Sequence, residues 1–146
     1  KGSIFVFMFL EALAYSMVLG IVLHFLVRVV LLSAGGLPGN ALQNIALSLG
    51  AGLFEEFFFR VLLLNVLFWA LRFILRTTLL TGVVSILIAS LLFSLSHYIG
   101  NMADTFQWYS FFFRWLAGLL FTLLYFFRGF AITAYTHALY DIQVLL

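Results

Sequence analysis

The sequence contains no cysteine, a single proline and very few charged residues. Without cysteine the chain forms no disulfide, thiolate metal site or iron–sulfur cluster, and it has no thiol nucleophile. Only 8% of its 146 residues are charged, against roughly 25% in soluble domains. The basic residues are scattered along the chain, which argues against a nucleic-acid partner. The composition therefore excludes a soluble globule.

Apolar residues make up 66% of the chain, and they form long runs. A helix needs roughly 20 apolar residues to cross a bilayer core of ~30 Å, so the sequence predicts an all-α, polytopic transmembrane helix bundle of about five helices. There is no internal repeat or linker, so one membrane-embedded domain over residues 1–146 is expected. The absence of an initiating Met leaves room for further spans upstream or downstream. The predicted spans are about 4–32, 41–69, 78–98, 108–127 and 130 to the end, with a turn signal at 33–40.

The few charges between the spans predict an orientation. Five alternating crossings group four basic residues on one side of the membrane, and place Asp104 on the other with only Arg28 and Arg114 near it. By the positive-inside rule, the basic side is cytoplasmic. The four basic residues are Lys1, Arg72, Arg76 and Arg128.

Four charged residues fall inside predicted spans, where each costs roughly 2.5–3.5 kcal/mol unless it is paired. Glu55, Glu56 and Arg60 lie in the second span, and Asp141 lies in the fifth. Glu56 and Arg60 are four residues apart, so they share a helix face and can form an ion pair. Glu55 points about 100° away from Glu56 and is left without a local counter-charge. We interpret it as the carboxylate available for general acid or base chemistry.

Histidines add to this polar set. His97 ends the third span, and His137 and Asp141 share a face of the fifth. We expect Glu55, Glu56, His97, His137 and Asp141 to meet in a cavity between the second, third and fifth helices. Two chemistries fit these residue types: a zinc or iron site, with Glu55, His97, His137 and Asp141 as ligands, or metal-free activation of water. The HExxH zinc motif is absent, and spacing alone leaves both chemistries open.

Other polar residues in the spans carry weaker signals. Glu11 is interpreted as a packing acid or an indirect partner of the site, and His24 and Arg28 as structural residues. Arg114 lies near the start of the fourth span behind two aromatic residues, which is typical of a membrane interface.

Three motifs on successive hydrophobic helices, Glu-Glu-x-x-x-Arg, Phe-x-x-x-His and His-x-x-x-Asn/Asp, together resemble the CPBP family. This family includes the CAAX prenyl endoproteases and the bacterial Abi-type intramembrane proteases. The motifs occur here in the family's order, with about forty residues between successive motifs. They are Glu55, Glu56 and Arg60, then Phe93 and His97, then His137 and Asp141.

The resemblance implies an intramembrane endopeptidase in which a glutamate and a histidine activate water. In that mechanism Glu55 is the general base and His97 helps to orient the water. Glu56 and Arg60 hold the helix and the catalytic carboxylate in place. His137, with the residue at 141, stabilises the oxyanion. No cofactor is required, although a divalent metal such as zinc is kept as an alternative.

Asp141 departs from the commoner Asn of that family. An ionised Asp is only an acceptor and cannot donate to an oxyanion. Three roles stay open: Asp141 is protonated, it orients His137, or it helps to bind a cation.

The resemblance also implies a peptide or lipidated membrane protein as substrate, the lipid bilayer as environment, and a bacterial cytoplasmic membrane in preference to the endoplasmic reticulum. A non-proteolytic scaffold or bacteriocin-immunity protein of the same fold, gripping a transmembrane partner, is the alternative. An ion or proton transporter is a weaker one, because the sequence shows no inverted repeat.

Overall fold

A computed structural model describes residues 2–26, 41–100 and 103–145, and everything in these ranges that has regular structure is helical. Four of the helices are long and apolar enough to cross a membrane, which confirms the predicted integral membrane bundle. In chain order the elements are α1 (Gly2–Leu26), α2 (Ala41–Glu56), the π-helix η2 (Phe57–Leu63), α3 (Leu64–Leu75), α4 (Thr78–Ser96) and α5 (Trp108–Leu145).

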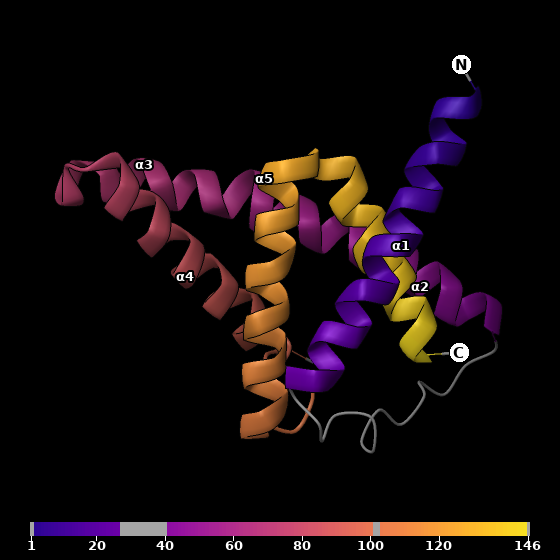
Figure 1. The fold of residues 1–146 in the computed structure, drawn as a ribbon. Helices are drawn as coiled ribbons and strands as arrows, with labels where there is room; N and C mark the ends of the chain where they lie inside the picture. Colours follow the sequence, from indigo (N-terminus) through magenta and orange to yellow (C-terminus); the bar gives the residue numbers. More distant parts are fainter. Residues whose placement is uncertain (1, 27–40, 101–102, 146) are drawn as a thin grey trace.

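The predicted fourth and fifth spans are the two arms of α5, which bends sharply at Gly129. This residue has φ 79° and ψ 177°, a conformation that glycine adopts with little strain. Figure 1 shows the first arm (108–128) running to the bend and the second arm (130–145) returning beside α1 and α2. The four long helices thus give five rod-like segments, close to the predicted count.

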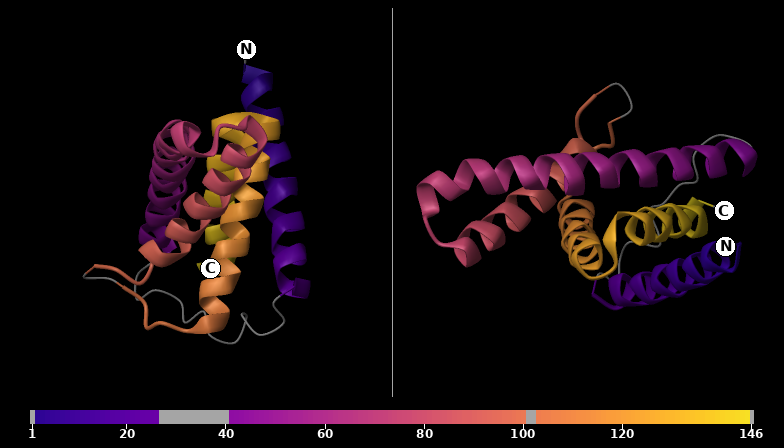
Figure 2. Two further views of the ribbon diagram at one scale, coloured as in Figure 1. Left: turned by 90° about the vertical axis from the view of Figure 1, so that its left-hand side faces the viewer. Right: turned by 90° about the horizontal axis from the view of Figure 1, so that it is seen from above.

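The second arm of α5 lies between α2 and α1, as the right-hand view of Figure 2 shows. Against α2, the contact is so close that a Cβ on Gly52 would lie 2.7 Å from the backbone nitrogen of Ala138. Against α1, the Gln143 amide donates to Ser16 Oγ at 2.9 Å. Because this arm carries His137, the two contacts fix where that imidazole lies relative to α2.

The helices α2, η2 and α3 form one continuous rod from Ala41 to Leu75. Its middle section, Phe57–Leu63, is a π-helix that begins directly after Glu56. Such wider turns are rare and are frequently found at functional sites. The rod ends at Arg76, whose φ of 59° is left-handed, and α4 returns from there.

The helix α4 packs on the first arm of α5. A Cβ on Gly118 would lie 3.1 Å from the Phe93 ring and 3.2 Å from Ser90 Cβ, so the two helices touch closely there. Near the end of α4, the Ser94 hydroxyl donates to the Phe111 carbonyl at 2.6 Å. These contacts bring the C-terminal end of α4 into the middle of the bundle.

At the bend of α5, Arg128 forms an ion pair with Glu11 of α1. The interpretation of Glu11 as a packing acid fits this contact. The side chain of His24 and the whole of Arg28 lie outside the described residues. Figure 1 places the α3–α4 turn and the α5 bend at one end of the molecule, opposite the segment that joins α4 to α5. Arg72, Arg76 and Arg128 therefore share an end, as predicted, and its assignment to the cytoplasm stays a prediction.

Candidate active site

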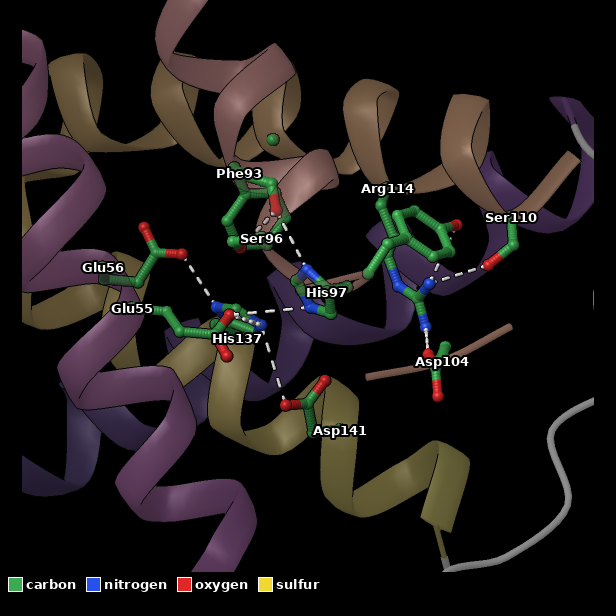
Figure 3. Close-up of polar contacts among 12 residues, drawn as sticks. Glu55, Glu56, Phe93, Ser96, His97, Asp104, Ser110, Arg114, His137 and Asp141 are labelled. Carbon is green, nitrogen blue, oxygen red and sulfur yellow. Dashed lines mark hydrogen bonds and ion pairs between the residues drawn. The ribbon is translucent and has the colours of Figure 1, made fainter. Parts of the chain in front are cut away.

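The predicted polar residues meet in one place, shown in Figure 3. Glu55 and Glu56 close α2, His97 follows the last residue of α4, and His137 and Asp141 lie on the second arm of α5. These are the second, third and fifth segments of the bundle, which is the meeting that the sequence predicts.

His137 is the centre of the cluster, and its two ring nitrogens face different partners. Nδ1 lies 2.8 Å from Glu56 Oε1. Because the ionised carboxylate only accepts hydrogen bonds, Nδ1 carries the proton. Nε2 faces Asp141 Oδ2 at 3.6 Å and Glu55 Oε2 at 3.9 Å. Glu56 thus fixes the ring so that Nε2 points toward the other two acids.

Glu56 is held in turn by Arg60, as the four-residue spacing predicts. Arg60 Nε lies 3.0 Å from Glu56 Oε2, and Nη2 donates to the Gly118 carbonyl at 3.2 Å. The guanidinium also lies over the Phe93 ring, 4.5 Å from its centroid. Neither Arg60 nor Glu56 is more than 1% exposed, so the guanidinium supplies a counter-charge for a fully buried carboxyl group.

Two phenylalanines enclose the imidazoles. The ring of Phe121 stacks on His137, with centroids 4.4 Å apart and planes at 23°. The ring of Phe93 meets both histidines edge to face, at 5.1 Å from His97 and 5.9 Å from His137. These contacts exclude water from one face of His137 and restrict how either imidazole can rotate.

His97 presents a lone pair to Glu55. Its Nδ1 lies 2.9 Å from the Phe93 carbonyl, and a carbonyl only accepts, so Nδ1 carries the proton and Nε2 of the neutral ring is an acceptor. Nε2 lies 4.0 Å from Glu55 Oε2, which is too long for a direct hydrogen bond. Glu55 Oε2 is buried and has no hydrogen-bond partner among the described residues. Two acceptors that face each other at this distance suit a donor such as water between them.

The site has a sealed side and an open side. The Glu56 side chain is 0% exposed and that of His137 is 6% exposed, whereas those of Glu55, His97 and Asp141 are 24–27% exposed. The buried network therefore backs a group of side chains that water and a substrate can reach.

The metal alternative stays a prediction. Within the described ranges, no group of three or more His, Asp or Glu side chains is arranged to hold a metal ion. This includes Glu55, His97, His137 and Asp141, the set expected to bind a metal if one were present. We therefore derive no chemical step through a metal.

A model of the type II CAAX prenyl endopeptidase Rce1-like family matches residues 37–143 of the chain. The protein belongs to the Rce1-like family. The matched range contains all three motifs of the CPBP resemblance, which this result confirms. No curated protein and no solved structure matches the chain.

The Rce1-like motifs leave out several residues that shape this site. Gly52 allows α2 to approach the second arm, and Phe121 stacks on His137. Arg114, which the sequence places at a membrane interface, contacts the hydroxyl of Tyr98, the residue after His97. A small residue one turn before Glu56 is the only sequence signal for Gly52. No sequence signal distinguishes Phe121 from the many other phenylalanines of the chain.

Proposed function

We propose that this protein is an intramembrane endopeptidase that hydrolyses a peptide bond of a prenylated or otherwise membrane-associated substrate, using water activated by Glu55 and His97. The observation that carries the proposal is the position of Glu55 Oε2, about 4 Å from Nε2 of both histidines. The family supports the general activity, and the geometry supports the roles of individual residues.

Glu55 and His97 suit the activation of water because both present acceptors. A water between them donates one hydrogen to Glu55 Oε2 and the other to His97 Nε2, and its oxygen lone pair is then free to attack a carbonyl carbon. During attack Glu55 takes a proton from the water. It later gives that proton to the amine nitrogen as the carbon–nitrogen bond breaks, which leaves a free acid and a free amine.

His137 suits stabilisation of the oxyanion. Three acids, Glu55, Glu56 and Asp141, lie within 4 Å of its ring nitrogens. Nearby carboxylates favour a protonated imidazole. Because Nδ1–H is held by Glu56, Nε2–H of the imidazolium is the donor that faces the open side.

This arrangement also gives Asp141 a role without an amide donor. Asp141 Oδ2 lies 3.6 Å from His137 Nε2, beyond hydrogen-bond range. It therefore acts through its charge, which favours the protonated imidazole of His137. Because Asp141 does not accept the Nε2–H hydrogen bond, that N–H can donate to the substrate oxygen. Of the three roles left open by the sequence, we propose the support of His137.

The decisive experiment is Glu55→Gln. Gln keeps the size of the side chain but cannot take a proton, so we expect cleavage to fall about 100- to 10,000-fold, the range for loss of a general base. The measurement is kcat/KM on a farnesylated peptide in detergent or nanodiscs, with thermal unfolding as the check of folding. Glu11→Gln is the matched control, since Glu11 is also an intramembrane glutamate but pairs with Arg128 on α5.

If the Glu55→Gln variant cleaves the peptide as fast as the wild type, Glu55 is not the general base. Absence of cleavage by the folded wild-type protein would contradict the proposed activity itself.

A further inference from the structure

Beside the open side of the site lies a second polar cluster, centred on Arg114 of α5. Its Nη1 donates to Tyr98 Oη at 3.1 Å and to Ser110 Oγ at 2.9 Å, and its Nη2 donates to the carboxylate of Asp104. The guanidinium carbon also lies 5.3 Å from the centroid of the Tyr98 ring. Arg114 is thus held rigidly by Tyr98 and Ser110, with one edge turned toward a carboxylate (Figure 3).

The carboxylate on Arg114 belongs to an exposed residue of the connecting segment. The side chain of Asp104 is 55% exposed, whereas that of Arg114 is 22% exposed. An ion pair in such a position contributes little to stability because water solvates the acid well when it leaves. The guanidinium is therefore a fixed anion receptor whose present partner is easily exchanged.

Arg114 is also joined to the catalytic histidine. Tyr98 directly follows His97, and the Asp104 backbone N–H donates to the His97 carbonyl at 3.0 Å. An anion bound at Arg114 would therefore lie next to the residues that activate water.

The other arginines of the described ranges are either buried in the bundle or lie at its opposite end. Arg60 is buried against Glu56 and Gly118, and Arg128 pairs with Glu11 at the α5 bend. Arg72 donates to the Arg76 carbonyl at the α3–α4 turn, at the opposite end of the molecule from the α4–α5 connection. In the described part of the chain, Arg114 is the cation on the open side of the site.

We propose that Arg114 binds the C-terminal carboxylate of the substrate, which replaces the carboxylate of Asp104. The inference rests on the proposed function. A substrate cut close to its C terminus brings a carboxylate within a few residues of the scissile bond, and each extended residue spans about 3.3–3.6 Å. Exchange of one carboxylate for another keeps the charge of the cluster constant, and a guanidinium pairs bidentately with either.

The test compares two peptides that differ only at the C terminus. Both carry an S-farnesyl cysteine followed by three residues, and one ends in a free carboxylate and the other in a carboxamide. Binding is measured to the Glu55→Gln variant, which does not consume the peptide, and kcat/KM is measured with the wild type. We expect the acid to be preferred at least about 10-fold in both assays, since a charge-assisted hydrogen bond exceeds a neutral one.

Arg114→Gln should abolish this preference by weakening the acid about 10-fold or more while changing the amide little. Asp104→Asn should lower the KM for the acid, because it removes the competing carboxylate. Arg128→Gln is the matched control, since it removes an arginine at the far end of the first arm of α5, and it should keep the acid preference of the wild type.

Equal treatment of acid and amide by the wild type would overturn the assignment. So would equal losses for both peptides in Arg114→Gln, which is the result of a purely structural role. If the acid preference in binding is present and depends on Arg114 but neither peptide is cleaved, the carboxylate site is supported and the proposed peptidase activity is overturned.

Discussion

The two carboxylates that follow each other at the end of α2 lie in opposite surroundings. Glu56 is fully buried, with Oε1 2.8 Å from His137 Nδ1 and Oε2 in an ion pair with Arg60 Nε at 3.0 Å. Glu55 is 24% exposed, and among the described residues its ion-pair partners are the two imidazoles, at 3.9 and 4.0 Å, with no arginine. Consecutive residues on a helix point about 100° apart. This rotation is enough to place Glu56 in a buried structural network and Glu55 on the open side of the site. A sealed network can thus hold His137 still while the group beside it stays free to exchange protons.

The largest expected effect comes from breaking the sealed side. Arg60→Met leaves Glu56 as a buried charge with only the His137 imidazole beside it, and loss of one partner of a buried pair typically costs about 3–5 kcal/mol. The measurement is thermal or denaturant unfolding in detergent, with Glu55→Gln as the comparison on the open side. We expect the stability of the Glu55→Gln variant to be close to that of the wild type.

The double variant Glu56→Gln with Arg60→Met sharpens this test. It leaves neither charge unpaired, so much of the lost stability should return, while cleavage stays low because His137 has lost its charged partner. Wild-type stability in the single Arg60→Met variant would show that the sealed network does not support the fold.

A smaller effect is expected where the sealed side depends on close helix contact. In Gly52→Ala the new methyl would lie 2.7 Å from Ala138 N and 2.8 Å from its Cβ, so α2 and the second arm must move apart. Such overpacking costs about 1–3 kcal/mol, and it separates Glu55 from His137. The free energy of unfolding and kcat/KM should therefore both fall.

Gly50→Ala is the matched control, in the same helix and with no atom within 4 Å of the new Cβ. It should be neutral or stabilise the protein by up to about 1 kcal/mol, because alanine is the better helix former. Similar losses in both variants would indicate that helix flexibility, and not close contact, is what Gly52 provides.

The smallest effect is expected at Asp141. Its oxygen lies 3.6 Å from His137 Nε2, whereas Glu56 holds Nδ1 at 2.8 Å. Glu56→Gln removes a hydrogen bond between charged groups, usually about 1.5–3 kcal/mol, and should lower kcat/KM at least about 10-fold. Asp141→Asn removes only a charge and should cost less than about 10-fold, or about 1.4 kcal/mol. The reverse order in kcat/KM would make Asp141 the main partner of His137.

The sequence predicts the local parts of this site well. The Glu56–Arg60 pair follows from a four-residue spacing, and the boundary at Arg128 and Gly129 marks the bend in α5. The meeting of the second, third and fifth segments follows from their polar residues, because intramembrane charges need partners. Each of these predictions depends on spacing within one helix or on the cost of an isolated charge.

Contacts between helices were harder to predict. That Glu56 binds His137, that Phe121 stacks on the same ring, and that Arg114 reaches Tyr98 all depend on how helices are rotated against one another. Helical periodicity defines a face but does not say which helix covers it, and in this chain nearly every face is apolar. The π-helix at Phe57–Leu63 leaves no mark in the hydrophobic pattern either.

That π-helix sets the phase of the long rod from Ala41 to Leu75. Each residue added to a helix turns everything beyond it by about 100°, so a wider turn directly after Glu56 separates the register of α2 from that of α3. In the first half of the rod, α2 can therefore present its acids to α5. In the second half, α3 can pack on α4 with a face whose direction does not depend on that of α2. In a single uninterrupted α-helix, the faces that contact α5 and α4 would be fixed relative to each other by the regular helical repeat.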